Sequence, residues 1–172
     1  MTEVAESIET EEIDKKKLEN MLQFLSFTLG DEEYGVEILR VQEIRSWEPV
    51  SRIPNVPTYE KGVVNLRGAI VPIIDLRERF GLSHSEYTPL TVVVVLQAQN
   101  ETGQTRIMGV VVDSVSDVID VDKKTIQSSP NFGTKVSTEF INGLASVNER
   151  MVMLLDVEKL LKLENLDDED ES

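Results

Sequence analysis

The sequence predicts a mostly β protein, built as small barrels or as a sandwich. Three observations lead to this prediction: many short apolar runs, frequent glycine punctuation between them, and only two brief helical patterns. A break near the polar stretch 83–89 would divide the strands into approximate subdomains at 24–82 and 88–156. No sequence repeat relates the two halves.

The first predicted hairpin joins a strand at 22–29 to a return strand at 34–38. Apolar residues alternate with polar ones in the first strand, which predicts one dry face, and Gly30 begins the turn. A third strand is expected at 41–45, where the pattern also allows a helical turn. One turn of helix suits residues 58–61.

The most informative stretch is residues 62–76, GVVNLRGAIVPIIDL, in which two apolar runs flank Asn-Leu-Arg-Gly. We expect Gly68 to take a positive φ or form a bulge, in a turn that Asn65 can fix through its own backbone. Pro72 cannot donate a ladder hydrogen bond, so the second strand is expected at a sheet edge or with a bulge. Such a turn would present Arg67 as a docking cation more readily than as a catalytic group.

The rest of the chain continues the pattern of strands and turns. Four consecutive valines within 91–96 predict a strand that is buried on both faces. A short helix is expected at 76–80, and a C-terminal helix, capped by Asp156, is expected at 157–163. The remaining strands are expected at 107–112, 115–121, 140–145 and 151–155.

The formal net charge of −15 lies mainly in two acidic tails. Residues 1–20 carry −4 and residues 164–172 carry −6, which leaves −5 for a single folded domain at 21–163. Both tails are expected to be disordered. A mildly acidic body argues against nucleic acid and anionic membranes as partners. Since no apolar run resembles a signal peptide or spans a bilayer, we expect a cytoplasmic protein without membrane insertion.

The residue types give little support for catalysis or for a cofactor. The chain has no cysteine and one histidine, His84 in a polar loop, so zinc lacks ligands and a catalytic triad lacks its nucleophile elbow. No phosphate-binding glycine motif is present. Glu43 and Asp75 are conceivable as an acid–base pair, but nothing in the sequence singles out these two carboxylates. We therefore predict no enzymatic activity, no cofactor and no metal.

The surface offers a different function. Val41, Ile44 and Trp47 need not all fit inside one small barrel, and an apolar strip flanked by Glu43 and Arg67 would suit a partner helix. The simpler interpretation places Val41 and Ile44 in the core and leaves Arg67 solvated or paired internally. A small-ligand-binding β-barrel is the alternative from another class, and an enzyme is third.

Five blocks of sequence indicate a protein family more specifically than the overall composition does. They are residues 27–35 (FTLGDEEYG), 41–45 (VQEIR), 62–76, 111–118 (VVDSVSDV) and 158–161 (EKLL). In this order they closely resemble the CheW-like domain family of bacterial chemotaxis coupling proteins, over residues 24–163. The resemblance implies two small SH3-like β-barrels with a shared core. It also implies a stand-alone, non-catalytic adaptor that is monomeric when free.

The resemblance further implies two kinds of partner. The adaptor would couple the cytoplasmic tips of chemoreceptors to the regulatory domain of the histidine kinase CheA, within membrane-associated receptor arrays. Kinase autophosphorylation would then follow the state of the receptor. In this family the receptor tip docks in a groove between the barrels.

The family's binding positions can be matched in this chain. On the first barrel, the receptor-binding positions are Val41, Glu43, Ile44, Gly62 and Arg67. On the second barrel, they are Val92, Val115 and Val118. The kinase is expected near Val50 and Ile53 on the first barrel, and at Phe132 on the other. Opposite charge and a shared place at the groove predict an ion pair between Glu43 and Arg67.

Overall fold

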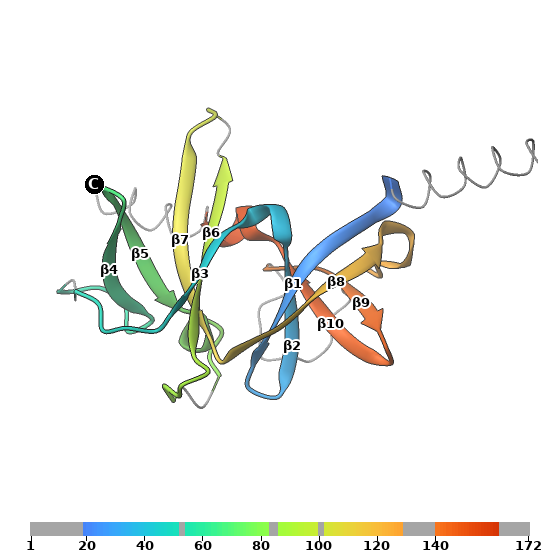
Figure 1. Cartoon of the computed structure of the whole chain (residues 1–172), viewed down its shortest axis with the longest axis horizontal. Coiled ribbons are helices and arrows are strands. Elements are labelled where there is room, and N and C mark those ends of the chain that lie inside the picture. Colours follow the sequence, from blue (N-terminus) through green and yellow to red (C-terminus); the bar gives the residue numbers. More distant parts are fainter. Residues whose placement is uncertain (1–18, 52–53, 83–85, 100–101, 129–139, 162–172) are drawn as a thin grey trace, which may run out of the picture.

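The computed structural model describes residues 19–51, 54–82, 86–99, 102–128 and 140–161. In this part of the chain, ten strands form two five-stranded sheets (Figure 1). One sheet has the strand order β8-β1-β2-β10-β9, and the other has the order β3-β6-β7-β5-β4. The mostly β fold predicted from the sequence is therefore confirmed.

The two sheets form two small barrels. The outer barrel contains β1 (Met21–Leu29), β2 (Glu32–Glu37), β8 (Ser114–Asp122), β9 (Ile141–Val147) and β10 (Arg150–Leu155). The inserted barrel contains β3 (Val41–Ser46), β4 (Glu60–Leu66), β5 (Ala69–Asp75), β6 (Val92–Gln99) and β7 (Thr105–Val112). Short helices are η1 (Ile38–Arg40), α2 (Leu76–Arg79), η2 (Lys123–Thr125) and a terminal turn at 157–161. Figure 1 shows the inserted barrel in one half of the molecule and the outer barrel in the other.

The boundary between the barrels differs from the predicted break near 83–89. All strands of the inserted barrel lie between residues 41 and 112, and the outer barrel takes the strands on both sides of that range. The chain crosses between barrels at η1 and again at Asp113. The sequence did not indicate this arrangement because β1 pairs with β8, a partner nearly a hundred residues away.

Each barrel closes through one extra backbone bridge next to an edge strand. In the inserted barrel, Ser51 bridges Val63 of β4. In the outer barrel, Gln127 bridges Leu144 of β9. In each sheet, the segment that follows one edge strand (β3 or β8) therefore bonds to the opposite edge strand (β4 or β9).

Apolar side chains form three clusters, one inside each barrel and one between them. Phe24, Ile119, Val121, Ala145, Val152 and Leu154 fill the outer barrel. Leu66, Val71, Ile73, Val93, Val95 and Val111 fill the inserted barrel. The shared core between the barrels includes Phe27, Leu29, Tyr34, Ile74, Phe80, Val94, Leu96, Val110, Phe140 and Leu155. This agrees with the shared core that the resemblance implies.

The strand of consecutive valines, β6, is apolar on both faces because each face lies in a different core. In β6, Val93 and Val95 point into the inserted barrel, whereas Val94 and Leu96 enter the shared core. The same principle corrects the prediction of a single dry face on the first strand. Phe24 lies inside the outer barrel while its neighbours face the shared core, so β1 is buried on both faces.

Two local predictions around the central hairpin were wrong. Residues 58–61 form a turn and the start of β4 rather than a helical turn, because pairing with β5 extends to Glu60. Strand β5 is not an edge strand, since it lies between β4 and β7, and the bulge in its pairing with β4 lies in β4, between Glu60 and Gly62. Its pairing with β7 begins only at Ile73, so Pro72 lies before that ladder and withholds no donor from it.

Candidate partner-binding site

The turn between β4 and β5 holds an exposed arginine. Leu66 pairs with Ala69, so Arg67 and Gly68 form a two-residue turn, with φ values of 52° and 89°. Positive φ at both positions suits the right-handed twist of a hairpin. The Asn65 side chain accepts a hydrogen bond from the Gly68 backbone N–H at 2.9 Å, as predicted. The Arg67 side chain is 82% exposed.

The predicted ion pair between β3 and this turn is present. Arg67 Nη2 donates to Glu43 Oε2 at 3.3 Å, and Arg45 Nε lies 3.7 Å from Glu43 Oε1. Only 24% of the Glu43 side chain is exposed, so a half-buried carboxylate orients a solvated guanidinium. Solvent exposure limits the contribution of such a pair to folding stability to about 0–1 kcal/mol. Its main effect is to restrict where Arg67 points.

Gly62 allows β3 and the hairpin to come together. Val63 N donates to Ser51 O at 2.9 Å, which joins the segment after β3 to β4. A Cβ atom on Gly62 would lie 2.0 Å from that carbonyl oxygen, and its φ of 146° is also unfavourable for other residues. Val50 packs beside it, half-buried against the interior of the inserted barrel. Any side chain at Gly62 would therefore push these strands apart.

The predicted apolar receptor positions fall into two groups. Val41, Val92 and Val115 are half-buried against the shared core. Ile44 and Val118 are 44% and 45% exposed. Ile44 therefore belongs to an exposed apolar surface, as one interpretation of the sequence predicted. Val41 packs against the core, as the other interpretation predicted.

One barrel assignment needs correction. Val92 belongs to the first, inserted barrel and not to the second, because β6 pairs with β3 and Val92 lies opposite Ser46. Val115 and Val118 lie on β8 of the outer barrel, as expected. Among the predicted kinase positions, Ile53 and Phe132 fall outside the described residues, as does His84.

A buried ionic network lies beside this surface and was missed from the sequence. We call it the Arg77 network: Asp75, Arg77, Tyr87, Asp113 and the backbone N–H of Gly30. Arg77 is fully buried and donates from Nε and Nη2 to the two carboxylate oxygens of Asp75, at 3.0 and 2.9 Å. Its Nη1 donates to Asp113 Oδ1 at 2.8 Å and to Glu86 O at 2.6 Å.

The network also includes an aromatic stack. The Arg77 guanidinium lies 5.1 Å from the centre of the Tyr87 ring, and Tyr87 stacks on Trp47 with 4.5 Å between ring centres. The Tyr87 hydroxyl donates to Asp75 Oδ2 at 3.2 Å. Burial, followed by the charge of Asp75, raises the pKa of Tyr87 to about 12. Burial alone would lower the pKa of Arg77, but its bonds to Asp75 and Asp113 raise it above the ordinary value.

The network changes the interpretation of two carboxylates. Asp75 is engaged with Arg77, and Glu43 is engaged with Arg67, so the two do not form the acid–base pair considered from the sequence. The available signal for the network was an aspartate that ends an apolar strand, followed two residues later by an arginine. Asp113 gave no signal of its own.

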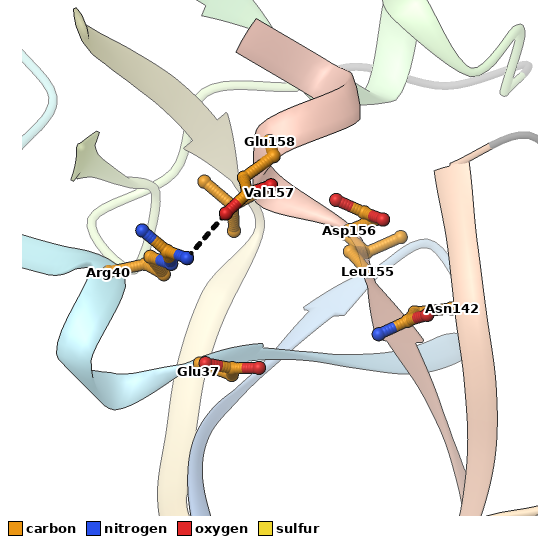
Figure 2. A pocket seen from close by; sticks show the side chains of 7 residues that line it. All are labelled: Glu37, Arg40, Asn142, Leu155, Asp156, Val157 and Glu158. Carbon is orange, nitrogen blue, oxygen red and sulfur yellow. Dashed lines mark hydrogen bonds and ion pairs between the residues drawn. The ribbon is translucent and has the colours of Figure 1, made fainter. Parts of the chain in front are cut away.

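A small polar pocket opens elsewhere, between the end of β2 and the terminal helical turn (Figure 2). Arg40 Nη2 and Glu158 Oε1 form an ion pair of 2.6 Å across it. The pocket is lined by Glu37, Arg40, Asn142, Leu155, Asp156, Val157 and Glu158. It contains none of the residues predicted to bind a partner.

Among the described residues, no group of three or more histidine, cysteine, aspartate or glutamate side chains is arranged to hold a metal ion. Within the same residues, no helix has the length and apolar character needed to cross a membrane.

Comparison with known proteins gives consistent matches. The model of the CheW-like domain matches residues 23–165. "Chemotaxis protein CheW" of Klebsiella aerogenes is 50% identical over 144 residues, covering 84% of both chains. "Probable chemotaxis protein CheW" of Rhizobium etli is 36% identical, covering 80% of this chain and 86% of the relative. The crystal structure of the scaffolding protein TtCheW from Thermoanaerobacter tengcongensis superposes with a TM-score of 0.70 at 29% identity, covering 79% and 84% of the two chains.

Proposed function

The chain belongs to the CheW-like domain family, and on that basis we propose that it is a non-catalytic adaptor that couples chemoreceptor tips to the histidine kinase CheA. A role as a chemotaxis scaffold is supported by the names of its relatives and of its structural neighbour. In this proposal the adaptor is cytoplasmic, monomeric when free, and recruited to membrane-associated receptor arrays.

The observation that carries the proposal is the geometry of Arg67. A two-residue turn with positive φ fixes its backbone, Glu43 orients its guanidinium, and most of its side chain faces solvent. Such a cation is available for a charged partner without a large loss of conformational freedom on binding. Ile44 and Val118 add exposed apolar surface, one from each barrel.

This combination suits an amphipathic helical partner. An acidic side chain on the partner would meet Arg67, while its apolar face would cover Ile44 and Val118. The half-buried valines Val41 and Val115 lie on the same two strands, β3 and β8, and pack against the shared core. The kinase would bind separately, near Val50 and Ile53 and, in a second contact, near Phe132.

The test is kinase autophosphorylation in the presence of receptor-bearing membranes, with and without this protein. We expect strong stimulation only when kinase, receptor and adaptor are all present. Arg67→Ala should remove most of that stimulation. Arg150→Ala is the matched control, because Arg150 is also exposed in an ion pair, with Glu33 at 3.4 Å, on the other barrel. Equal loss in both variants, or no stimulation by the folded wild-type protein, would contradict the proposal.

A second comparison tests the apolar part of the surface. Ile44→Asp places a charge on a side chain that is already 44% exposed, so it should weaken receptor binding while the protein stays folded. Val41→Asp places the same charge against the shared core, so it should also destabilise the fold. Binding to a receptor fragment and unfolding in urea separate the two effects. Retained binding by Ile44→Asp would argue against this part of the site.

Among the described residues, the barrel interiors do not favour the small-ligand-binding alternative. The interiors of both barrels are filled by the apolar clusters described above. Thermal-shift screening with metabolites distinguishes the two functions, because a bound ligand would raise the melting temperature.

A further inference from the structure

We infer that Asp113 is a positioning residue that sets the angle between the two barrels, and with it the spacing between the two parts of the proposed receptor site. This inference rests on the proposed function, because it concerns the same surface. It adds a specific group that links the barrels and that the family resemblance did not assign.

Asp113 occupies the second crossing between the barrels. It is the single residue between β7 and β8. Its backbone N–H donates to Thr28 O at 3.1 Å, and its Oδ2 accepts from the Gly30 N–H at 2.6 Å. Its Oδ1 accepts from Arg77 Nη1 at 2.8 Å. One carboxylate therefore joins the β1–β2 turn of the outer barrel to the inserted barrel.

Arg77, the partner of Asp113 on the side of the inserted barrel, is held in a fixed orientation. Arg77 is fully buried, and its planar guanidinium forms a two-bond fork with Asp75 that fixes the orientation of the group. A further bond to Glu86 O holds the same Nη1 that binds Asp113. Rotation of the guanidinium would break several buried, charge-assisted hydrogen bonds at once.

The same guanidinium connects to both parts of the proposed receptor site. On one side, Tyr87 covers Arg77 and stacks on Trp47, which directly follows the strand that carries Glu43 and Ile44. On the other side, β8 begins immediately after Asp113 and carries the outer-barrel part of the site. The two parts are thus attached to a common group.

The shared core also holds the barrels together, and the Phe80 ring contacts both Tyr34 and Phe140 across it. Apolar contacts such as these are less directional than hydrogen bonds. Hydrogen bonds depend steeply on distance and angle, so the bonds of Asp113 select one orientation. Substituting Asn for Asp113 keeps the shape of the side chain. If the amide oxygen still accepts from Gly30, its NH₂ group faces the N–H donors of Arg77, and the bridge is broken.

The test measures the distance between the barrels directly. The chain has no cysteine, so spin labels can be attached at Ala69→Cys in the inserted barrel and Ser146→Cys in the outer barrel, both exposed positions. We expect Asp113→Asn to widen or shift the distance distribution measured by double electron–electron resonance. Without labels, the same substitution should weaken binding of a cognate receptor cytoplasmic fragment about tenfold, corresponding to about 1.4 kcal/mol.

Asp120→Asn is the matched control, since it makes the same charge change at an exposed position on β8. It should leave both the distance distribution and the affinity unchanged. A distribution for Asp113→Asn that is the same as for Asp120→Asn would overturn the inference, even if its melting temperature fell. Loss of stability alone would indicate a merely structural role.

A second variant covers the case in which Asp113→Asn does not fold. Asp113→Glu keeps the charge and lengthens the side chain by one methylene, so we expect a shifted mean distance. An unshifted mean would again overturn the inference. If the wild-type protein fails to bind receptor fragments, the proposed function fails, whereas the distance measurement still decides whether Asp113 positions the barrels.

Discussion

Arg67 and Arg77 lie at the two ends of β5, yet their surroundings are opposite. The Arg67 side chain is 82% exposed and has one carboxylate partner, whereas the Arg77 side chain is fully buried and bonds to two carboxylates and a carbonyl. One cation is available to a partner, and the other is used entirely inside the molecule. The difference shows that the role of each arginine depends on its burial and on the partners that surround it, not on the residue type.

The largest expected effect is on stability, from removal of the buried arginine. Arg77→Leu leaves Asp75 buried without its cation, so we expect the free energy of unfolding to fall by about 3–5 kcal/mol. Arg67→Leu should change it by less than about 1 kcal/mol. Urea denaturation followed by circular dichroism measures both. Similar losses in the two variants would erase the distinction between the arginines.

The next effect concerns the hairpin that carries the exposed arginine. Gly62→Ala should cost about 2–4 kcal/mol, because overlap with Ser51 O adds to backbone strain. Gly68→Ala has positive φ but nothing within 4 Å of its Cβ, so it should cost only about 1–2 kcal/mol. Gly62→Ala should also reduce receptor binding although Arg67 is unchanged. Normal receptor binding by a folded Gly62→Ala protein would show that the position of the β4–β5 hairpin does not matter for receptor binding.

A smaller expected effect on receptor binding distinguishes the orientation of the Arg67 side chain, which Glu43 sets, from its charge. Glu43→Ala and Arg67→Ala should each weaken receptor binding, and the double variant should be little worse than Arg67→Ala alone. The expected coupling in binding is about 1 kcal/mol, while the coupling in unfolding should be smaller. A double-mutant cycle with a receptor fragment gives both values. Additive losses in binding would mean that Glu43 does not act through Arg67.

The smallest effect is a pH dependence from the ring beside the buried arginine. Since the folded-state pKa of Tyr87 is raised to about 12, its contribution to stability is complete below the unfolded pKa of about 10. That contribution is lost as pH rises through about 12. Tyr87→Phe should therefore lose less stability than wild type between these pH values. Burial also raises the pKa of Tyr34, so only the difference between the two proteins is informative.

Much of the fold followed from local pattern. The turn at Arg67 and Gly68, the strand of valines and the cap at Asp156 all depend on residues close in sequence. Such features are fixed by backbone sterics and by alternation, so they are visible in a single chain. The ion pair of Glu43 with Arg67 was also predicted, but only with the help of the family resemblance.

The predictions that were wrong or missing concern contacts between residues that are distant in sequence. Val92 was assigned to the wrong barrel because strand pairing, not strand sequence, determines which sheet a residue joins. The Arg77 network was missed because only Asp75 and Arg77 are close in sequence, whereas Tyr87 comes from a loop and Asp113 from the β7–β8 crossing. A buried charge is tolerated only when such distant partners converge, and no local pattern reports that convergence.

The insertion of one barrel within another also constrains the order of folding. Strand β1 reaches β8 only after the intervening chain closes, and closure is easier once residues 41–112 have become compact. The strand pairings of the inserted barrel all lie within its own range, so these pairings can form before the outer strands join. Pulse-labelled hydrogen exchange during refolding should protect amides of β6 and β7 before those of β1. The part of the proposed partner surface around Arg67 would then form before the part on β8.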